Sequence, residues 1–88
     1  MRSFSISYNP DLTDAAVVAL VQVFPRSLVD VGFVECAIGD EGGEALLRWS
    51  KQAADLRMIC VEGNRFSMAI RKGFASLARE RANLIVVI

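Results

Sequence analysis

The sequence contains no histidine, and its ten basic residues are balanced by ten acidic ones. Without imidazole, the chain cannot form a His-based catalytic triad, an imidazole metal site or an imidazole proton shuttle. A formal net charge of zero also excludes the overall basic character expected of a general nucleic-acid binder. We therefore predict no catalytic residue set, no metal site, no cofactor and no nucleic-acid partner.

Cysteines and long hydrophobic runs are also scarce. The two cysteines, Cys36 and Cys60, lie in apolar segments, so we expect reduced thiols and no disulfide framework. The first ten residues lack the continuous hydrophobic stretch of a signal peptide. The most apolar run, 15–24, is half as long as the roughly 20 residues that a membrane-spanning helix needs. We expect a soluble, cytoplasmic protein without direct membrane insertion.

The composition predicts one small folded domain over residues 1–88. Hydrophobic residues make up 53% of the chain, enough for a modest core of its own. Charge is distributed unevenly, since residues 1–44 contain two basic and seven acidic residues and residues 45–88 contain eight basic and three acidic. This asymmetry is typical of two solvated faces, and it also suits a charged protein partner or head-to-tail association.

Hydrophobic periodicity predicts strands that alternate with helices. Serines alternate with Phe4, Ile6 and Tyr8, which predicts a half-buried strand with a hydroxyl face outward. Asp11 is the expected cap of the first helix, which the proline at position 25 ends. The other expected elements are a strand over 28–38, a helix over 41–54, a strand over 57–61, a helix capped by Asn64 and a strand over 84–88.

This β-α-β-α-β-α-β order predicts an α/β fold with a largely parallel four-stranded sheet and packed helices. The apolar segment 28–38 favours a central strand covered on both faces, and Gly73 predicts a break in the last helix. We detect no internal repeat. In open parallel sheets, function tends to lie where strands end and helices begin, which indicates the loops 39–43 and 60–65.

The first of these loops carries a family resemblance. Residues 40–47, DEGGEALL, follow an apolar strand and open a helix. They resemble the signature of STAS domains, the fold of bacterial anti-sigma-factor antagonists and of sulfate-transporter tails, which reads Asp-Ser-(Ser/Ala)-Gly before a leucine-rich helix. Asp40 matches the aspartate of the signature and Gly43 its glycine. The resemblance implies a single STAS-like domain that binds another protein in a regulatory role.

Glu41 occupies the position of the serine that antagonists present to a partner kinase. A carboxylate cannot accept phosphate there, so the resemblance implies that the usual phosphorylation switch is absent. It also implies a protein partner, either a kinase-type anti-sigma factor or the ATPase of an ABC transporter. The expected partner-binding residues are those of the loop and the outward side of the following helix: Asp40, Glu41, Gly42, Gly43, Glu44, Arg48 and Lys51.

The same residues also have a purely structural interpretation. Asp40 can cap the helix, Glu41 and Glu44 favour its positive N-terminal end, and the two glycines allow a tight turn. Glu44 and Arg48 are spaced to form an i,i+4 ion pair.

The second loop suggests an enzymatic alternative. Cys60, Gly63 and Arg65 resemble the Cys-x-x-Gly-x-Arg active loop of rhodanese-like sulfurtransferases, in which the cysteine carries persulfide sulfur. The characteristic histidine motif of that family has no counterpart here. The structural interpretation is a buried strand cysteine followed by a glycine turn.

We expect a non-enzymatic protein–protein interaction module of STAS type. Two alternatives remain. The chain is a sulfurtransferase-like enzyme that uses Cys60, or it is a structural protein that self-assembles as a homo-oligomer. Self-assembly would use the apolar helix 14–24 or the serine-faced edge strand.

Overall fold

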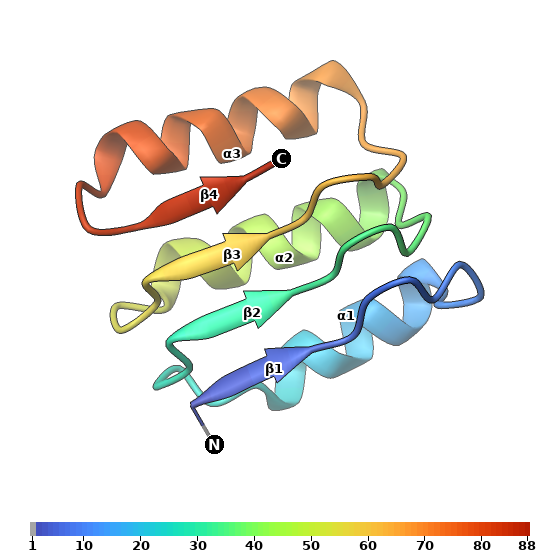
Figure 1. Cartoon of the computed structure of the whole chain (residues 1–88), viewed down its shortest axis with the longest axis horizontal. Coiled ribbons are helices and arrows are strands. Elements are labelled where there is room, and N and C mark those ends of the chain that lie inside the picture. Colours follow the sequence, from blue (N-terminus) through green and yellow to red (C-terminus); the bar gives the residue numbers. More distant parts are fainter. Residues whose placement is uncertain (1) are drawn as a thin grey trace.

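The computed structural model describes residues 2–88 as seven elements in β-α-β-α-β-α-β order (Figure 1). The strands are β1 (Ser3–Ser5), β2 (Asp30–Gly32), β3 (Met58–Cys60) and β4 (Ile85–Val87). The helices are α1 (Asp14–Val23), α2 (Asp40–Gln52) and α3 (Met68–Glu80). The predicted α/β class is confirmed. Within residues 2–88, no helix combines the length and the apolar character needed to cross a bilayer.

The four strands form one parallel sheet whose spatial order follows the chain order, β1-β2-β3-β4. All three helices lie on the same side of this sheet, behind it in Figure 1. Connections of one hand between successive neighbouring strands place every crossover helix on one face. The molecule therefore has two layers, and the second face of the sheet is open.

Segment 28–38 contains a central strand, as predicted, because β2 lies between β1 and β3. The predictions that the strand spans the segment and is covered on both faces were wrong. Only Asp30–Gly32 pairs as a strand, and Asp30 itself is exposed. The apolar residues that follow, Phe33, Cys36 and Ile38, are fully buried under the helices, in the loop that leads to α2. Their hydrophobicity reflects a buried loop and not a second covered sheet face.

Two of the predicted helix starts were wrong. The cap of α1 is Thr13, whose hydroxyl oxygen accepts a hydrogen bond from the backbone N–H of Ala16 at 3.1 Å, and not Asp11. The cap of α3 is Ser67, whose hydroxyl accepts from the N–H of Ile70 at 3.4 Å, and not Asn64. In both cases a hydroxyl two or three residues further on is the side chain at the helix entrance.

Two further local predictions were also wrong. Gly73 does not break α3, which runs continuously through it. Its missing side chain admits Leu47, because a Cβ at position 73 would lie 2.5 Å from Leu47 Cδ2. Tyr8 does not face the core: it is 71% exposed, and its positive φ of 58° ends the alternation of β1.

The expectation of no internal repeat is contradicted by the backbone. Leu28, Leu56 and Leu84 are all buried, and the N–H of each donates to the carbonyl oxygen three residues earlier, at 3.0–3.2 Å. The third residue after each of the first three strands takes a left-handed φ: Tyr8 (58°), Glu35 (53°) and Gly63 (74°). Ala37, with a φ of 56°, is a second left-handed residue after β2. The chain therefore repeats one strand–loop–helix unit every 27 or 28 residues.

The core lies between the sheet and the helices. Each strand contributes an inward side chain, of which Val31 and Ile59 are buried, and each helix contributes at least one buried side chain such as Val17, Leu46 or Phe74. Helix α2 therefore packs with Trp49 in the interior, as its sequence pattern predicts.

Candidate binding surfaces

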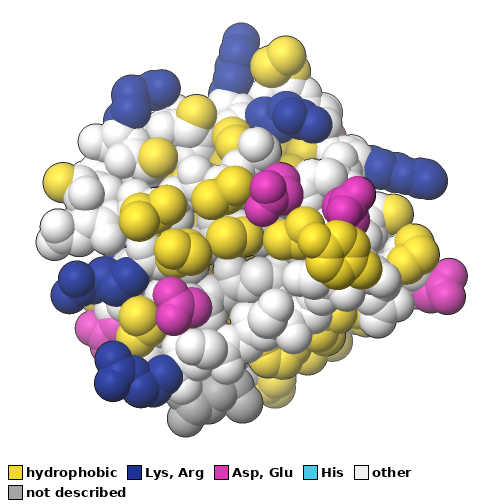
Figure 2. Space-filling model, viewed as in Figure 1, with side chains coloured by type: hydrophobic (Ala, Val, Ile, Leu, Met, Phe, Trp, Pro, Cys, Tyr) yellow, Lys and Arg dark blue, Asp and Glu magenta, His cyan; other side chains and the backbone are white. Residues whose placement is uncertain are grey.

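The open face of the sheet carries outward side chains from all four strands. The parallel register aligns them in two rows. One row contains Ser3, Asp30, Met58 and Ile85, and the next contains Ser5, Gly32, Cys60 and Val87. The face is therefore small and polar at β1 and apolar at β3 and β4. Figure 2 shows a band of hydrophobic side chains that crosses this face, with acidic side chains beside it.

A shallow hollow of about 240 Å³ lies on this face, over β1, β2 and β3. Gly32 contributes no side chain at its floor, and the hydroxyl of Ser5 lies only 3.1 Å from where a Cβ of Gly32 would be. The hydroxyl of Ser3 donates to Asp30 Oδ2 at 3.3 Å. Asp30 is the single charged residue that lines the hollow. The surface thus combines hydroxyl, apolar and acidic groups.

Cys60 lies on the same open face, half-buried at the end of β3, and both cysteines are free thiols. Burial raises the pKa of the Cys60 thiol, and the negative charges of Glu62 and Asp30 raise this pKa further. A nucleophilic cysteine needs the opposite shift, because the thiolate is its reactive form. The site thus gives no support to the sulfurtransferase alternative.

Asn64 has a structural role in the second loop. It is buried, and its Oδ1 accepts hydrogen bonds from the backbone N–H groups of Cys36 and Ile38, each at 3.0 Å. Its Nδ2 donates to the carbonyl oxygens of Phe33 at 2.6 Å and Val61 at 2.9 Å. One amide therefore joins the loop after β2 to the loop after β3 and satisfies four backbone groups.

The predicted partner-binding loop is also built into the fold. Asp40 is the first residue of α2 and not its cap, because the N-cap is Gly39, which has no side-chain hydrogen bond. Asp40 Oδ1 instead accepts from the backbone N–H of Ser67 at 2.7 Å. Hydrogen bonds from Ser67 lower the pKa of Asp40, and burial opposes them only weakly. Gly42 and Gly43 are buried, and a Cβ at either would lie within 2.7 Å of a side chain, of Ile38 or Phe66 respectively. Asp40, Gly42 and Gly43 thus have structural roles.

The other four predicted partner-binding residues are exposed along α2. They are Glu41, Glu44, Arg48 and Lys51. Glu44 and Arg48 form the predicted i,i+4 ion pair at 2.8 Å, with both side chains largely in solvent. Such an exposed pair contributes little to stability, so these side chains are free to meet a partner.

A groove of about 340 Å³ lies between α1 and α2, on the side of the molecule opposite the open sheet face. Its lining residues come from both helices and from the turn that follows α1: Val18, Val21, Gln22, Phe24, Arg26, Ala45, Arg48, Trp49 and Gln52. Arg26 Nη2 donates to Gln52 Oε1 at 3.0 Å, which joins the two walls. The lining contains two guanidinium groups and no carboxylate.

Trp49 is 7% exposed, and its indole Nε1–H is buried with no hydrogen-bond partner among residues 2–88. The indole packs edge-on against Phe24, with ring centroids 5.3 Å apart. A buried donor that lacks an acceptor costs about 1–3 kcal/mol. Because the fold otherwise satisfies its buried side-chain polar atoms within the described residues, this nitrogen is an exception that requires an explanation.

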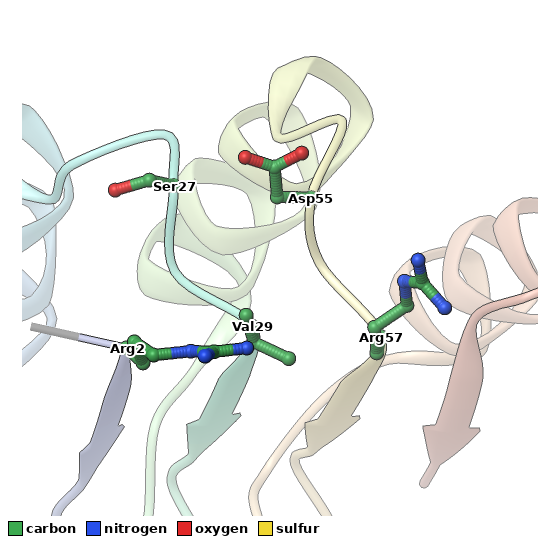
Figure 3. Close-up of a pocket in the computed structure, with 5 residues that line it drawn as sticks. All are labelled: Arg2, Ser27, Val29, Asp55 and Arg57. Atoms are coloured by element: carbon green, nitrogen blue, oxygen red, sulfur yellow. The ribbon is translucent and has the colours of Figure 1, made fainter.

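A further hollow, of about 650 Å³, lies at the end of the sheet where β2 and β3 begin, and is lined by Arg2, Ser27, Val29, Asp55 and Arg57. Figure 3 shows Arg2 reaching toward Val29, whereas Arg57 and Asp55 turn away. Since these polar groups do not converge on one point, the hollow has no arrangement suited to a single ligand.

Among residues 2–88, no three potential metal ligands gather into a cluster. No family model matches the chain, and no curated protein is significantly similar to it.

Proposed function

We propose that this chain is a protein-binding module that engages its partner through the open face of its sheet. The observation that carries the proposal is the chain-order parallel sheet with all helices on one side. Repeating units stacked in this way present a continuous row of outward strand side chains, which repeat proteins use as extended binding surfaces. An uncovered sheet face with apolar and acidic side chains fits a protein partner with an apolar centre and basic groups.

The spacing of the buried residues supports this proposal. Leucine-rich repeats follow the order L-x-x-L-x-L-x-x-N/C-x-L, with one strand per unit. The segments Leu28–Ile38 and Leu56–Phe66 resemble that order, with Cys36 and Asn64 at the N/C position. Leu28, Val31, Phe33, Cys36 and Ile38 of the first segment, and Leu56, Ile59, Val61, Asn64 and Phe66 of the second, are all buried.

The proposal is tested by placing a charge on the open face. Ile85 is 56% exposed there and Met68, at the start of α3, is 66% exposed elsewhere, so Ile85→Glu and Met68→Glu make a matched pair. Tagged wild-type and variant proteins are recovered from the cells of origin, and co-purifying proteins are quantified by mass spectrometry. We expect Ile85→Glu to reduce recovery of the partner at least tenfold, about 1.4 kcal/mol of binding free energy, and Met68→Glu to leave recovery unchanged. Equal recovery with both variants contradicts the proposal.

The STAS-type contact is a second candidate for the same activity. The exposed Glu41 and Glu44, together with Val18, Ala45 and Arg48, line a small hollow of about 230 Å³ beside the first turns of α2, which favours it. Glu41→Lys in the same experiment distinguishes the STAS-type contact from a contact through the open sheet face. Loss of the partner with Glu41→Lys, and not with Ile85→Glu, assigns the contact to the loop 40–43 and α2. Light scattering of the isolated protein measures its oligomeric state and so tests the alternative that the chain self-assembles as a homo-oligomer.

A further inference from the structure

The groove between α1 and α2 has features of a ligand site that are independent of the open sheet face. It is concave, its floor is apolar through Val18, Val21 and Phe24, and its volume of about 340 Å³ lies in the range of small binding pockets. The groove is lined by residues of α1, of the turn after it and of α2. Both helices lie behind the sheet in Figure 1, so a partner on the open sheet face would leave the groove free.

The polar groups of the groove are mainly donors. Arg26 has no carboxylate within ion-pair distance among residues 2–88, and its guanidinium retains donors beyond the one given to Gln52. Trp49 also lines the groove, and its covered indole N–H has no acceptor among residues 2–88. Arg48 adds a second guanidinium, already paired with Glu44. A site with unpaired donors and no lining carboxylate is complementary to a ligand that brings negatively charged acceptors.

We propose that this groove binds an acidic peptide segment of another protein. A carboxylate of the segment pairs with Arg26 and accepts the hydrogen bond of Trp49 Nε1, while a neighbouring apolar side chain packs on Val18 and Val21. The indole nitrogen is covered in the free protein. Contact with this nitrogen therefore requires side chains to move at the groove, where Arg26 and Gln52 are exposed.

The test uses a library of random twelve-residue peptides displayed on phage and selected on the immobilised full chain. Binding of the enriched peptides is then titrated by tryptophan fluorescence, because Trp49 is the single tryptophan of the sequence and lies in the groove. We expect enrichment of Asp and Glu beside apolar residues, saturable change of the emission, and at least tenfold weaker binding when the acidic residues of the peptide are replaced by Asn and Gln.

Protein variants locate the site. Arg26→Met, at an exposed position, is expected to weaken the acidic peptide at least tenfold, and Trp49→Phe, followed by calorimetry, about fivefold. Lys72→Met removes an exposed positive charge from α3 and is expected to change nothing. Circular dichroism confirms that each variant is folded. If Trp49→Phe does not fold, Arg26→Met alone decides the question.

Four outcomes overturn the proposal. They are the absence of any enriched peptide, enrichment without excess acidic residues, equal binding by the amide-substituted peptide, and equal binding by Arg26→Met and wild type. A twelve-nucleotide oligothymidine is titrated in parallel. If it changes the emission as strongly as the peptide does, the groove recognises phosphate and not an acidic protein segment.

Discussion

Cys36 and Asn64 occupy the same position in two successive units, yet they hold the structure together in different ways. The Cys36 thiol donates weakly, to the carbonyl oxygens of Ile6 at 3.3 Å and Val34 at 3.5 Å. Asn64 makes four hydrogen bonds of 3.0 Å or less to backbone groups, three in the segment after β2 and one in its own segment after β3. At this position a small buried side chain contacts the loop of the preceding unit. The amide of Asn64 offers strong donors and a strong acceptor, whereas the thiol of Cys36 is weak in both functions.

The difference shows where the fold depends on hydrogen bonds and where it depends on packing. The loop after β3 is fixed to its neighbour by a polar network within a buried site. At the position of Cys36 the loop after β2 depends on packing, since Cys36, Phe33 and Ile38 are fully inaccessible to solvent. Its hydrogen bonds to the first unit lie on either side of this position, where the N–H of Tyr8 donates to the carbonyl oxygen of Val34 at 2.7 Å and the N–H groups of Gly39 and Gly42 donate to the Asp14 carboxylate at 3.0 and 2.8 Å. Removing the side chain of Asn64 or of Cys36 is therefore expected to lower the free energy of unfolding by different amounts.

The largest effect is expected from Asn64→Ala. It removes the partner of four buried backbone groups, and each unsatisfied group costs about 1–3 kcal/mol before water or local rearrangement compensates. We expect the free energy of unfolding to fall by about 3 kcal/mol, measured by urea denaturation. The matched variant Cys36→Ala removes one buried sulfur and weak hydrogen bonds, so we expect a loss of about 1 kcal/mol. Equal losses contradict the proposed difference between the loops.

The second effect is expected at the left-handed residues that precede this position, Glu35 and Gly63. Gly63 has a φ of 74°, and a Cβ there would lie 2.4 Å from Glu35 Cγ. We expect Gly63→Ala to lower the free energy of unfolding by about 2 kcal/mol, through backbone strain and this close contact. Glu35→Gly is expected to change stability by less than about 0.5 kcal/mol, because the relief of strain offsets the greater freedom of the unfolded chain.

A double-mutant cycle separates the two causes. In the Glu35→Gly background the contact with the Glu35 side chain is absent, and a contact of 3.3 Å with the Cα of residue 35 remains. Gly63→Ala is therefore expected to cost mainly the strain of the left-handed conformation, about 1 kcal/mol. An identical cost in both backgrounds would show that the contact between the two residues contributes nothing.

The sequence predicts the order of the elements because strands and helices here have clear hydrophobic periods. It did not reveal that segment 28–38 is mostly loop, since the residues of a loop buried by a neighbouring unit are as apolar as those of a covered strand. The signal that would have shown the repeat is the spacing of Leu28, Leu56 and Leu84, each followed three residues later by a β-branched residue.

The candidate sites were harder to predict for a related reason. Asp40 and Gly43 stand out in the sequence as a motif, but the structure uses them to join and pack units. The open face was not predicted because it depends on all three helices lying on one side. The groove at Trp49 depends on how α1 and α2 pack, which local pattern does not specify.

The smallest effect is expected from Asp40→Asn, in the connection between the second and third units. Hydrogen bonds from Ser67 lower the pKa of Asp40 in the folded protein, so the folded state binds a proton less readily than the unfolded chain. The carboxylate therefore contributes stability above the unfolded pKa of about 3.9, and this contribution is lost as the pH falls through the lower folded pKa.

Asn at position 40 still accepts from the Ser67 N–H, so the loss of stability at pH 7 is small. We expect urea denaturation to show wild type slightly more stable than Asp40→Asn at pH 7, with the difference shrinking as the pH falls below 4. Asp11→Asn makes the same charge change at an exposed carboxylate with no hydrogen bond in the described residues. A difference for Asp40→Asn that grows toward low pH would mean that the neutral acid, and not the carboxylate, stabilises the loop.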